Sequence, residues 1–312
     1  MNTIDLQIQS TISDGKQTPR ELVGMARDRA LQVIALTDHD TVDGVSDALA
    51  AGTEYGLRVI PGIEISVADH HAHILGYGID HRNAALNEGL EKARRARVES
   101  VRETMENLKK NEGFVVEWDD VLNDTPGTVS VTRLHLVRAI MKHSENQKLL
   151  EGVTKKDFFD RFLQEGGHNY IPRLTMSAKD AIAHIHTAGG ATVWSHPAIH
   201  FRSREEFGSP VNPEALETFL QELVSWGIDG VEVFNPSHTE DDVEFMESLA
   251  VKYNLARTAG SDFHDAGTHP RDPGTGLHSA DTLGDYETYG FSTDGIVERL
   301  DEAILRRRAG TA

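Results

Sequence analysis

Short apolar runs alternate with amphipathic segments along most of the chain. Residues 33–36 form a continuous apolar run, Val-Ile-Ala-Leu, which is typical of a strand buried on both faces. Further strands are predicted at residues 4–10, 58–60, 73–77, 191–194, 230–234 and 255–259. Strand and helix alternate over about the first 80 residues and again from about Ser177, which indicates an α/β fold.

Two helix starts are recognisable from their capping residues. Thr18 is followed by Pro19 and Glu21, a combination typical of an N-cap, a first helical proline and a capping box. Asn212 and Pro213 precede a segment whose apolar residues recur at helical spacing. We therefore expect helices to begin at Pro19 and Pro213.

The pattern changes in the middle of the chain. From residue 83 to residue 173, apolar residues such as Leu86, Leu90, Val101, Met105 and Leu108 recur at helical spacing among many charges. We predict a helical insertion domain at 83–173. The barrel domain would then be discontinuous, comprising residues 1–82 and 174–312.

Composition and charge limit the possible functions. The chain of 312 residues has no cysteine, which excludes disulfides, thiolate zinc sites and cysteine nucleophiles. Without a long apolar run or an N-terminal signal peptide, we expect a cytoplasmic protein with no membrane partner. The net charge of −19 disfavours binding to long nucleic acid, but a small anionic substrate is compatible with it if metal ions supply positive charge locally.

The predicted strands are bordered by histidine and carboxylate residues. In barrels of parallel strands the catalytic groups sit at the carboxyl ends of the strands, so this pattern predicts one convergent polar site. The candidate metal ligands are Asp14, His39, Glu64, His73, His196, Asp262 and His264. Such ligands suit Mn, Fe or Zn ions, and a carboxylate such as Glu64 can bridge two of them.

Each of these residues also has an ordinary structural explanation. Asp14 before Gly15 fits a turn, Asp262 fits a helix cap, and His39 between two aspartates fits a hydrogen-bonded surface group. Convergence at the strand ends favours the metal site, because seven independent coincidences are improbable.

Five segments together resemble one superfamily. They are Asp5-Leu6-x-Ile8-x-Ser10 with Ser13-Asp14-Gly15, Ala35-Leu36-Thr37-Asp38-His39-Asp40, Pro61-Gly62-Ile63-Glu64, Ser195-His196-Pro197 and Gly260-Ser261-Asp262-Phe263-His264. In this order they resemble the polymerase-and-histidinol-phosphatase (PHP) superfamily of metal-dependent phosphoesterases. The resemblance implies a distorted (β/α)7 TIM-like barrel with an inserted helical domain, and two or three divalent metal ions as cofactors.

Two further stretches resemble one branch of that superfamily. Arg133-Leu134-His135 and Gly189-Gly190 are similar to segments of members that hydrolyse nucleoside 3′,5′-bisphosphates or trim short RNA from its 5′ end. The resemblance implies that Arg133 and His135 bind substrate phosphate, as a planar guanidinium can do in bidentate fashion. The alternative is that Arg133 pairs with a carboxylate. His200, Arg202 and Arg173 are weaker candidates for phosphate binding.

One departure from the superfamily pattern stands out. Members open with His-x-His on the first strand, whereas this chain has Gln7 and Gln9, so these are degenerate metal positions. The family pattern would assign that pair one ion, together with Glu64 and Asp262. It leaves a second ion to Glu64, His73 and His196, and a third to Asp14, His39 and His264.

Three hypotheses follow from these observations. The first is a phosphoesterase that removes phosphate from a small nucleotide, or from a short 5′-phosphorylated oligonucleotide, by metal-activated hydroxide. The alternative is a PHP protein with an impaired metal site that binds nucleotide or metal with little turnover, as Gln7 and Gln9 suggest. A third is another metal-dependent hydrolase such as an amidohydrolase, although no candidate for its usual lysine is visible.

Overall fold

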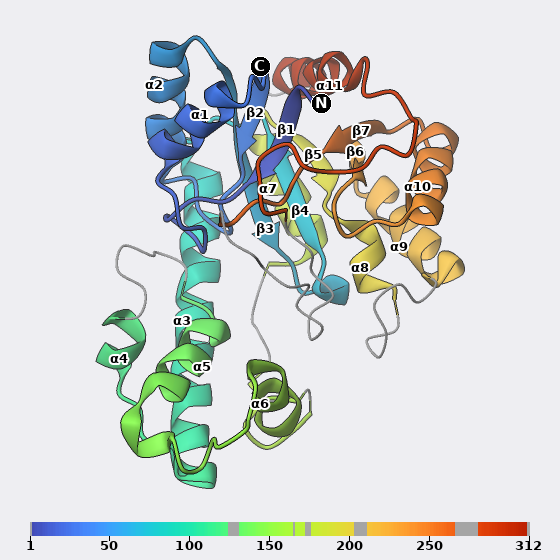
Figure 1. The fold of residues 1–312 in the computed structure, drawn as a ribbon. Coiled ribbons are helices and arrows are strands. Elements are labelled where there is room, and N and C mark those ends of the chain that lie inside the picture. Colours follow the sequence, from blue (N-terminus) through green and yellow to red (C-terminus); the bar gives the residue numbers. More distant parts are fainter. Residues whose placement is uncertain are drawn as a thin grey trace. The chain divides into compact units, whose positions relative to one another are not determined.

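Two compact units divide the chain (Figure 1). The computed structural model describes residues 2–123, 131–164, 166–171, 176–202, 211–265 and 280–310. One unit comprises Met1–Leu90 and Met176–Ala312, and the other comprises Glu91–Thr175. The predicted domain boundaries at residues 83 and 173 stay a prediction, and Arg173 lies outside the described residues.

The first unit is a distorted seven-stranded α/β barrel, which confirms the predicted fold class. The sheet order follows the sequence, from β1 to β7. The strands are β1 (Ile4–Ile8), β2 (Val33–Leu36), β3 (Arg58–Ser66), β4 (His73–Tyr77), β5 (Ala191–Trp194), β6 (Gly230–Phe234) and β7 (Ala256–Ala259). Beyond β7, Phe263 forms a parallel bridge with Ile8 and accepts a hydrogen bond of 2.9 Å from the backbone N–H of Gln9. This contact links the last strand segment to the first.

Strand β4 runs against its neighbours. It pairs antiparallel with β3 and with β5, whereas β1–β3 and β5–β7 pair in parallel. His73, the first residue of β4, is opposite Ser66, the last residue of β3. His73 therefore begins its strand and still lies at the edge where the parallel strands end.

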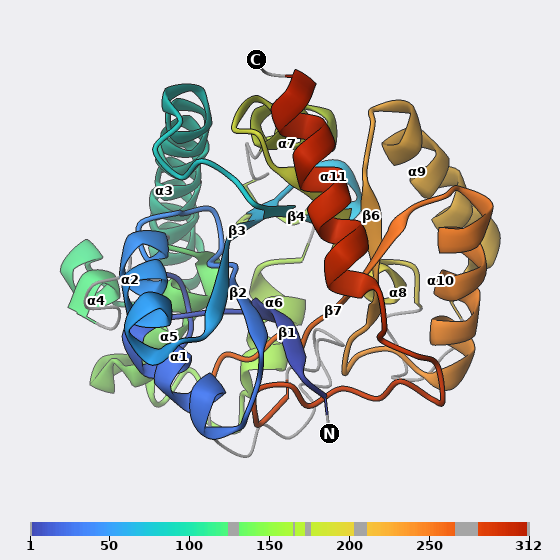
Figure 2. The same cartoon turned by 90° about the horizontal axis from the view of Figure 1, so that it is seen from above.

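Helices cover the outside of the barrel in Figure 2, where α10 packs on β6 and α11 on β7. The helices of this unit are α1 (Pro19–Asp28), α2 (Val45–Tyr55), α7 (Ala178–Thr187), α8 (Pro197–His200), α9 (Pro213–Ser225), α10 (Glu240–Lys252) and α11 (Ile296–Gly310), with a short 3-10 helix at Asp69–His71. Thr18 and Glu21 form the predicted capping box of α1, and Asn212 caps α9 through the N–H of Ala215. Both predicted helix starts are thus confirmed.

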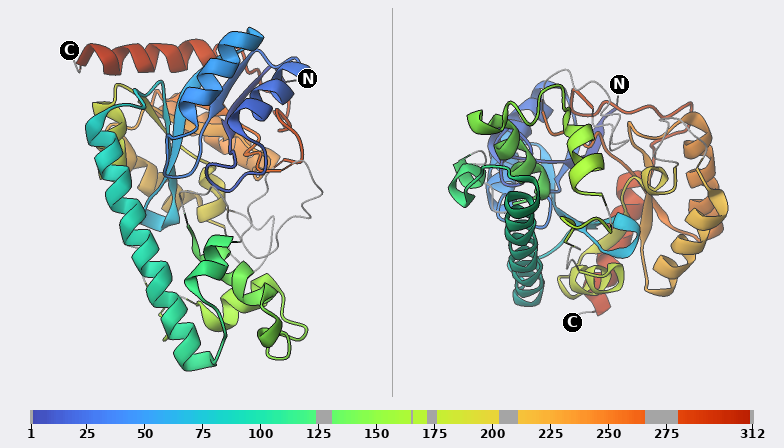
Figure 3. Two further views of the ribbon diagram at one scale, coloured as in Figure 1. Left: turned by 90° about the vertical axis from the view of Figure 1, so that its left-hand side faces the viewer. Right: turned by 90° about the horizontal axis from the view of Figure 1, so that it is seen from below.

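The second unit has a hydrophobic core of its own. Val101, Met105 and Leu108 of the long helix α3 (Ala84–Glu112) are buried in it, with Leu136 of α5 and Phe158 of α6. Figure 3 shows α3 along its whole length. The other helices are α4 (Trp118–Asn123), α5 (Arg133–Lys142) and α6 (Lys155–Phe162), with a 3-10 turn at Ser144–Asn146. Among the described residues of either unit, no helix is both long and apolar enough to cross a membrane.

A buried carboxylate on β1 ties three parts of the barrel together. Asp5 accepts hydrogen bonds from the backbone N–H and the hydroxyl of Ser261, at 2.9 and 2.6 Å, and from the N–H of Gly284 at 2.6 Å. Burial raises the pKa of Asp5 from 3.8 to about 6, although these hydrogen bonds oppose the change. Asp5 therefore connects β1 both to the segment after β7 and to the chain that precedes α11.

The raised pKa of Asp5 predicts a specific pH dependence of stability. Because the folded protein holds this proton more tightly than the unfolded chain, the stabilisation is complete below about pH 4 and is lost as pH rises through about 6. The native protein should be more stable than Asp5→Ala at low pH. This difference in unfolding free energy should fall by about 3 kcal/mol as the pH rises from about 4 to about 7. Urea unfolding followed by circular dichroism measures this difference, with Asp28→Ala as an exposed control. A difference that does not change with pH would contradict the prediction.

Candidate metal centre

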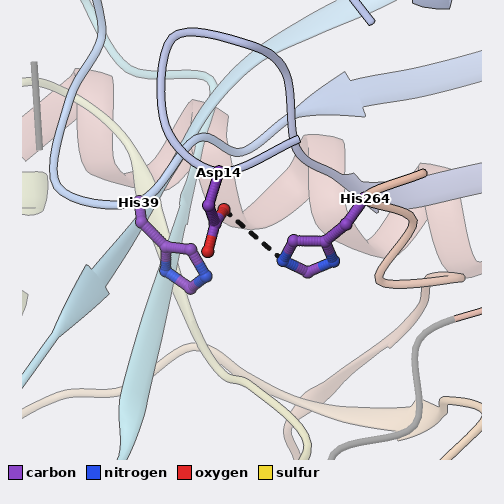
Figure 4. Close-up of side chains that lie close together, drawn as sticks. All are labelled: Asp14, His39 and His264. Atoms are coloured by element: carbon purple, nitrogen blue, oxygen red, sulfur yellow. Dashed lines mark ion pairs between the residues drawn. The ribbon is translucent and has the colours of Figure 1, made fainter. Parts of the chain in front are cut away.

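Three predicted ligands converge at one edge of the barrel (Figure 4). Asp14 lies in the loop after β1, His39 follows β2 and His264 follows β7. One potential ligand atom from each lies within 4.8 Å of the others, and Nε2 of His264 lies 3.5 Å from a carboxylate oxygen of Asp14. The Nδ1–H of His264 donates to the carbonyl of Asp262 at 2.6 Å, so Nε2 is the ring atom that faces Asp14 and would bind a cation. This first group has the ligand atoms that a divalent cation requires.

A second group shares His39 with the first. His39, Glu64 and His73 also place ligand atoms within 4.8 Å of one another. Nδ1 of His39 is buried without a hydrogen-bond partner among the described residues and lies 3.8 Å from Oε2 of Glu64. Oε1 of Glu64 lies 2.8 Å from Nδ1 of His73 and 3.1 Å from Nε2 of His196. This second group, together with His196, therefore also fits a divalent cation.

Asp262 lies beside these groups without joining either of them. Its carboxylate is 4.0 Å from Nδ1 of His264, and its backbone adopts the left-handed conformation with φ of 52°. His196 also has a positive φ, of 29°. Such backbone geometry is strained for residues other than glycine and persists only where the surroundings enforce it. The strain coincides with the strand ends that carry the predicted ligands.

Negative charge dominates the electrostatics of this edge. Burial alone would lower the pKa of His39, but Glu64 and three further carboxylates outweigh burial and raise it to about 9. Burial opposes ionisation of Glu64, yet the surrounding histidines hold its pKa well below the usual value. Burial lowers the pKa of His73 to about 4 and raises that of Asp262 to about 6. A buried carboxylate cluster of this kind favours a cation among its ligands.

Two aspartates that flank His39 hold the neighbouring segments in place. Asp38 accepts hydrogen bonds from the backbone N–H of Ser10 and from the hydroxyls of Ser10 and Ser13, each at 2.7 Å. Asp40 accepts from the N–H and the hydroxyl of Ser66 at the end of β3, at 3.0 and 2.9 Å. Asp38 thus fixes the loop that carries Asp14, and Asp40 fixes the strand that carries Glu64.

Gln7 of β1 and Gln9, which directly follows this strand, point into the same site and are fully buried. Nε2 of Gln7 donates to Oε2 of Glu64 at 3.1 Å and to the hydroxyl of Ser195 at 2.9 Å. Nε2 of Gln9 donates to the same oxygen of Glu64 at 2.8 Å. Where the superfamily pattern places a histidine pair, this chain presents N–H donors to Glu64. Such donors do not fit a cation at that position.

Further buried polar residues contribute to the site without having been predicted from the sequence. Glu232 of β6 accepts hydrogen bonds from the N–H of His196 at 2.8 Å and from Asn235 at 3.1 Å, and burial raises its pKa well above the usual value. His238 is buried and donates from Nδ1 to the carbonyl of Val233 at 2.8 Å. The sequence could have revealed Glu232 as a site residue, because it is a charged residue within the apolar run of β6. Asn235 and His238 follow this strand without any recognisable motif.

The predicted phosphate-binding residues occupy two different regions. In the second unit, Arg133 begins α5 and its guanidinium lies 4.9 Å from the ring centroid of Tyr170. No carboxylate of the described residues lies within 4.0 Å of the Arg133 guanidinium. Among these residues, Arg133 therefore has no partner for the ion pair that was its alternative role. His135 is buried, and its Nδ1 accepts from the N–H of Thr132 at 3.0 Å.

Two of the three weaker candidates, His200 and Arg202, lie in the barrel unit, where they differ in their surroundings. The ring of His200 lies 5.3 Å from that of His196 and 6.0 Å from that of His73. Burial holds the pKa of His200 well below its usual value. Arg202 instead forms an ion pair with Asp242 at the start of α10. His200 is therefore next to the candidate ligands, whereas Arg202 already has a carboxylate partner.

A barrel edge with histidines and carboxylates from separate strands is typical of metal-dependent hydrolases. The PHP domain family model matches residues 5–193, and the chain belongs to this family. The 3′,5′-nucleoside bisphosphate phosphatase of Chromobacterium violaceum is 31% identical to it over 276 residues, covering 88% of this chain and 91% of that protein.

Two further similarities agree with this assignment. The 5′-3′ exoribonuclease of Haemophilus influenzae is 28% identical over 262 residues, covering 83% of this chain and 89% of that protein. A crystal structure from Bifidobacterium adolescentis, provisionally named a metal-dependent phosphoesterase, has a TM-score of 0.73 and 28% identity. It covers 97% of this chain and 96% of the other. The chain is thus a phosphoric ester hydrolase by class.

The contacts of Asp38 predict that it acts through the loop of Asp14. Asp38→Ala removes three hydrogen bonds to that loop, so Mn²⁺ affinity should fall about 10- to 100-fold, as is usual when a partner of a ligand is lost. Competition with a fluorescent chelator measures the affinity. Asp43→Ala, at an exposed position in the same segment, is the matched control. Equal Mn²⁺ affinity in a folded Asp38→Ala protein would refute this role.

Proposed function

We propose that this protein removes phosphate from small phosphorylated nucleotides, such as nucleoside 3′,5′-bisphosphates or short 5′-phosphorylated oligonucleotides. The observation that carries the proposal is the convergence of Asp14, His39 and His264 beside Glu64 and His73 at one barrel edge. The names of the relatives from C. violaceum and H. influenzae support this class of substrate. The lack of cysteine is compatible with the cytoplasmic location that the sequence predicts.

Two divalent ions fit the residues of this edge, and Mn, Fe and Zn all accept such ligands. Asp14, His39 and His264 would hold one ion, and Glu64, His73 and His196 would hold the other. Ions bound there would activate water and neutralise the phosphoryl oxygens.

The chain's own residues would bind and orient the phosphate ester. Arg133 offers a guanidinium that stacks on Tyr170, an arrangement that pre-orders its planar N–H donors. His200 lies beside His196 and His73, and its buried Nε2 has no hydrogen-bond partner among the described residues. We infer that Nε2 of His200 contacts the ester within the barrel site. Arg133 and His135 of the second unit would bind substrate phosphate, as the family resemblance implies.

The alternative is a PHP protein that binds nucleotide or metal with little turnover. The observation that favours it is the replacement of the histidine pair by Gln7 and Gln9. The two functions differ in phosphate release, because a binding protein would bind the same nucleotide without hydrolysing it.

Phosphate release from 3′-phosphoadenosine 5′-phosphate in the presence of Mn²⁺ decides between the two. We expect turnover by the native protein and none detectable for His39→Ala, since His39 belongs to both ligand groups. His168→Ala, at a position 70% exposed, should keep native turnover. Nucleotide binding by calorimetry without phosphate release would establish the alternative function instead.

Arg133→Lys is expected to raise KM about 10-fold with a smaller effect on kcat. Lysine keeps the charge but loses the planar bidentate donors, so ground-state phosphate binding should weaken most. Arg138→Lys on the same helix is the matched control. An unchanged KM in a protein that is otherwise active would exclude Arg133 from phosphate binding.

A further inference from the structure

Three buried amide side chains meet at the position of the missing histidine pair. Gln7, Gln9 and Asn235 are each at most 2% exposed, and their polar atoms face Glu64 and Glu232. An amide can present either its oxygen or its nitrogen to a neighbour. The orientation of these amides therefore decides whether the position offers ligands to a cation or hydrogen-bond donors to a carboxylate.

A backbone N–H fixes the orientation of this network. The N–H of Ser237, which can only donate, lies 3.0 Å from Oδ1 of Asn235, so that oxygen must face Ser237. Nδ2 of Asn235 then donates to Oε1 of Gln7 at 3.2 Å and to Glu232 at 3.1 Å. With its oxygen held by Asn235, Gln7 can only direct its Nε2 towards Glu64 and Ser195.

Gln9 has its orientation set by Glu64 itself. Its Nε2 lies 2.8 Å from Oε2 of Glu64, and a reversed amide would bring two oxygens together at that distance. Oε1 of Gln9 is buried without a donor among the described residues, so the position retains one neutral oxygen in place of two imidazoles. Neither Asp262 nor Glu232 joins a group of three close ligands in this part of the chain.

The two carboxylate oxygens of Glu64 consequently have different partners. Oε2 accepts from Gln7 and Gln9, at 3.1 and 2.8 Å. Oε1 faces His73 at 2.8 Å and His196 at 3.1 Å, and it also accepts from the hydroxyl of Ser195 at 3.1 Å. A carboxylate that bridges two ions needs a lone pair on each oxygen directed at a cation. Here amide protons occupy the side of Oε2.

We propose that Gln7 and Gln9 replace one metal ion by two hydrogen bonds, so that Glu64 binds metal through Oε1 alone and the chain holds two divalent ions. Asn235 is the positioning residue, because it turns the nitrogen of Gln7 towards Glu64. The inference rests on the two-ion site of the proposed function and adds the reason why the position of Gln7 and Gln9 holds no third ion; the count of ions holds whether or not the protein turns over any nucleotide.

Metal content per chain tests the proposal directly. The native protein, saturated with Mn²⁺ and passed through a desalting column, should retain two ions by elemental analysis. The double variant Gln7→His with Gln9→His should retain three. Gln32→His with Gln221→His adds two histidines at exposed positions and should stay at two.

Three results would overturn the proposal. They are three ions in the native protein, two ions in a folded double variant, or an additional ion in the exposed-histidine control. If the double variant does not fold, the native count still decides whether the position holds metal.

The stability of the metal-free protein gives a second, independent readout. Gln9→Leu puts a slightly shorter, branched apolar side chain at this position and removes the donor to Oε2 of Glu64. After treatment with a chelator, its melting temperature should lie several degrees below that of the native protein, because a buried carboxylate loses a partner. Gln221→Leu, at an exposed position, is the control. Equal melting temperatures of Gln9→Leu and the native protein would show that the amide does not take the place of a cation.

Discussion

The buried carboxylate of Glu64 is the charge around which the barrel edge is organised. It is fully buried, and its partners come from the ends of β1, β4 and β5. An unpaired buried charge costs a folded protein much free energy. The neighbouring strands must therefore offer Glu64 hydrogen-bond donors, or ligands that hold a cation beside it. The positions of Gln7, His73, Ser195 and His196 therefore follow from one requirement.

Three buried aspartates stabilise neighbouring segments of the barrel in a similar way. Asp38 ties the loop after β1, Asp40 ties the end of β3, and Asp5 ties the segment that closes the barrel. Each is a buried carboxylate that accepts hydrogen bonds from backbone N–H groups and serine hydroxyls. Rigid loops of this kind allow ligands from distant parts of the sequence to keep fixed separations.

The sequence was sufficient for the α/β class and the two capped helix starts, because these depend on local patterns. It also singled out Asp14, His39 and His264, since residues at strand ends converge when strands run in parallel. The antiparallel direction of β4 was not predicted, although the connection between Ser66 and His73 is too short for the crossover that a parallel pair requires. Nor could the sequence predict the amide orientations at Asn235 and Gln7, which a single N–H of Ser237 determines, directly for Asn235 and through Asn235 for Gln7.

The separate origin of the ligands has a consequence for how such sites diverge. Each strand end contributes its own one or two side chains, and the first strand could exchange both without altering the strands that carry His39, His73, His196 and His264. A chain of this kind can thus lose one metal position through local substitutions while the other ligands keep their strands. Searches that rely on a histidine pair at the first strand would pass over it, whereas the Asp-His-Asp sequence after the second strand would still reveal its ancestry.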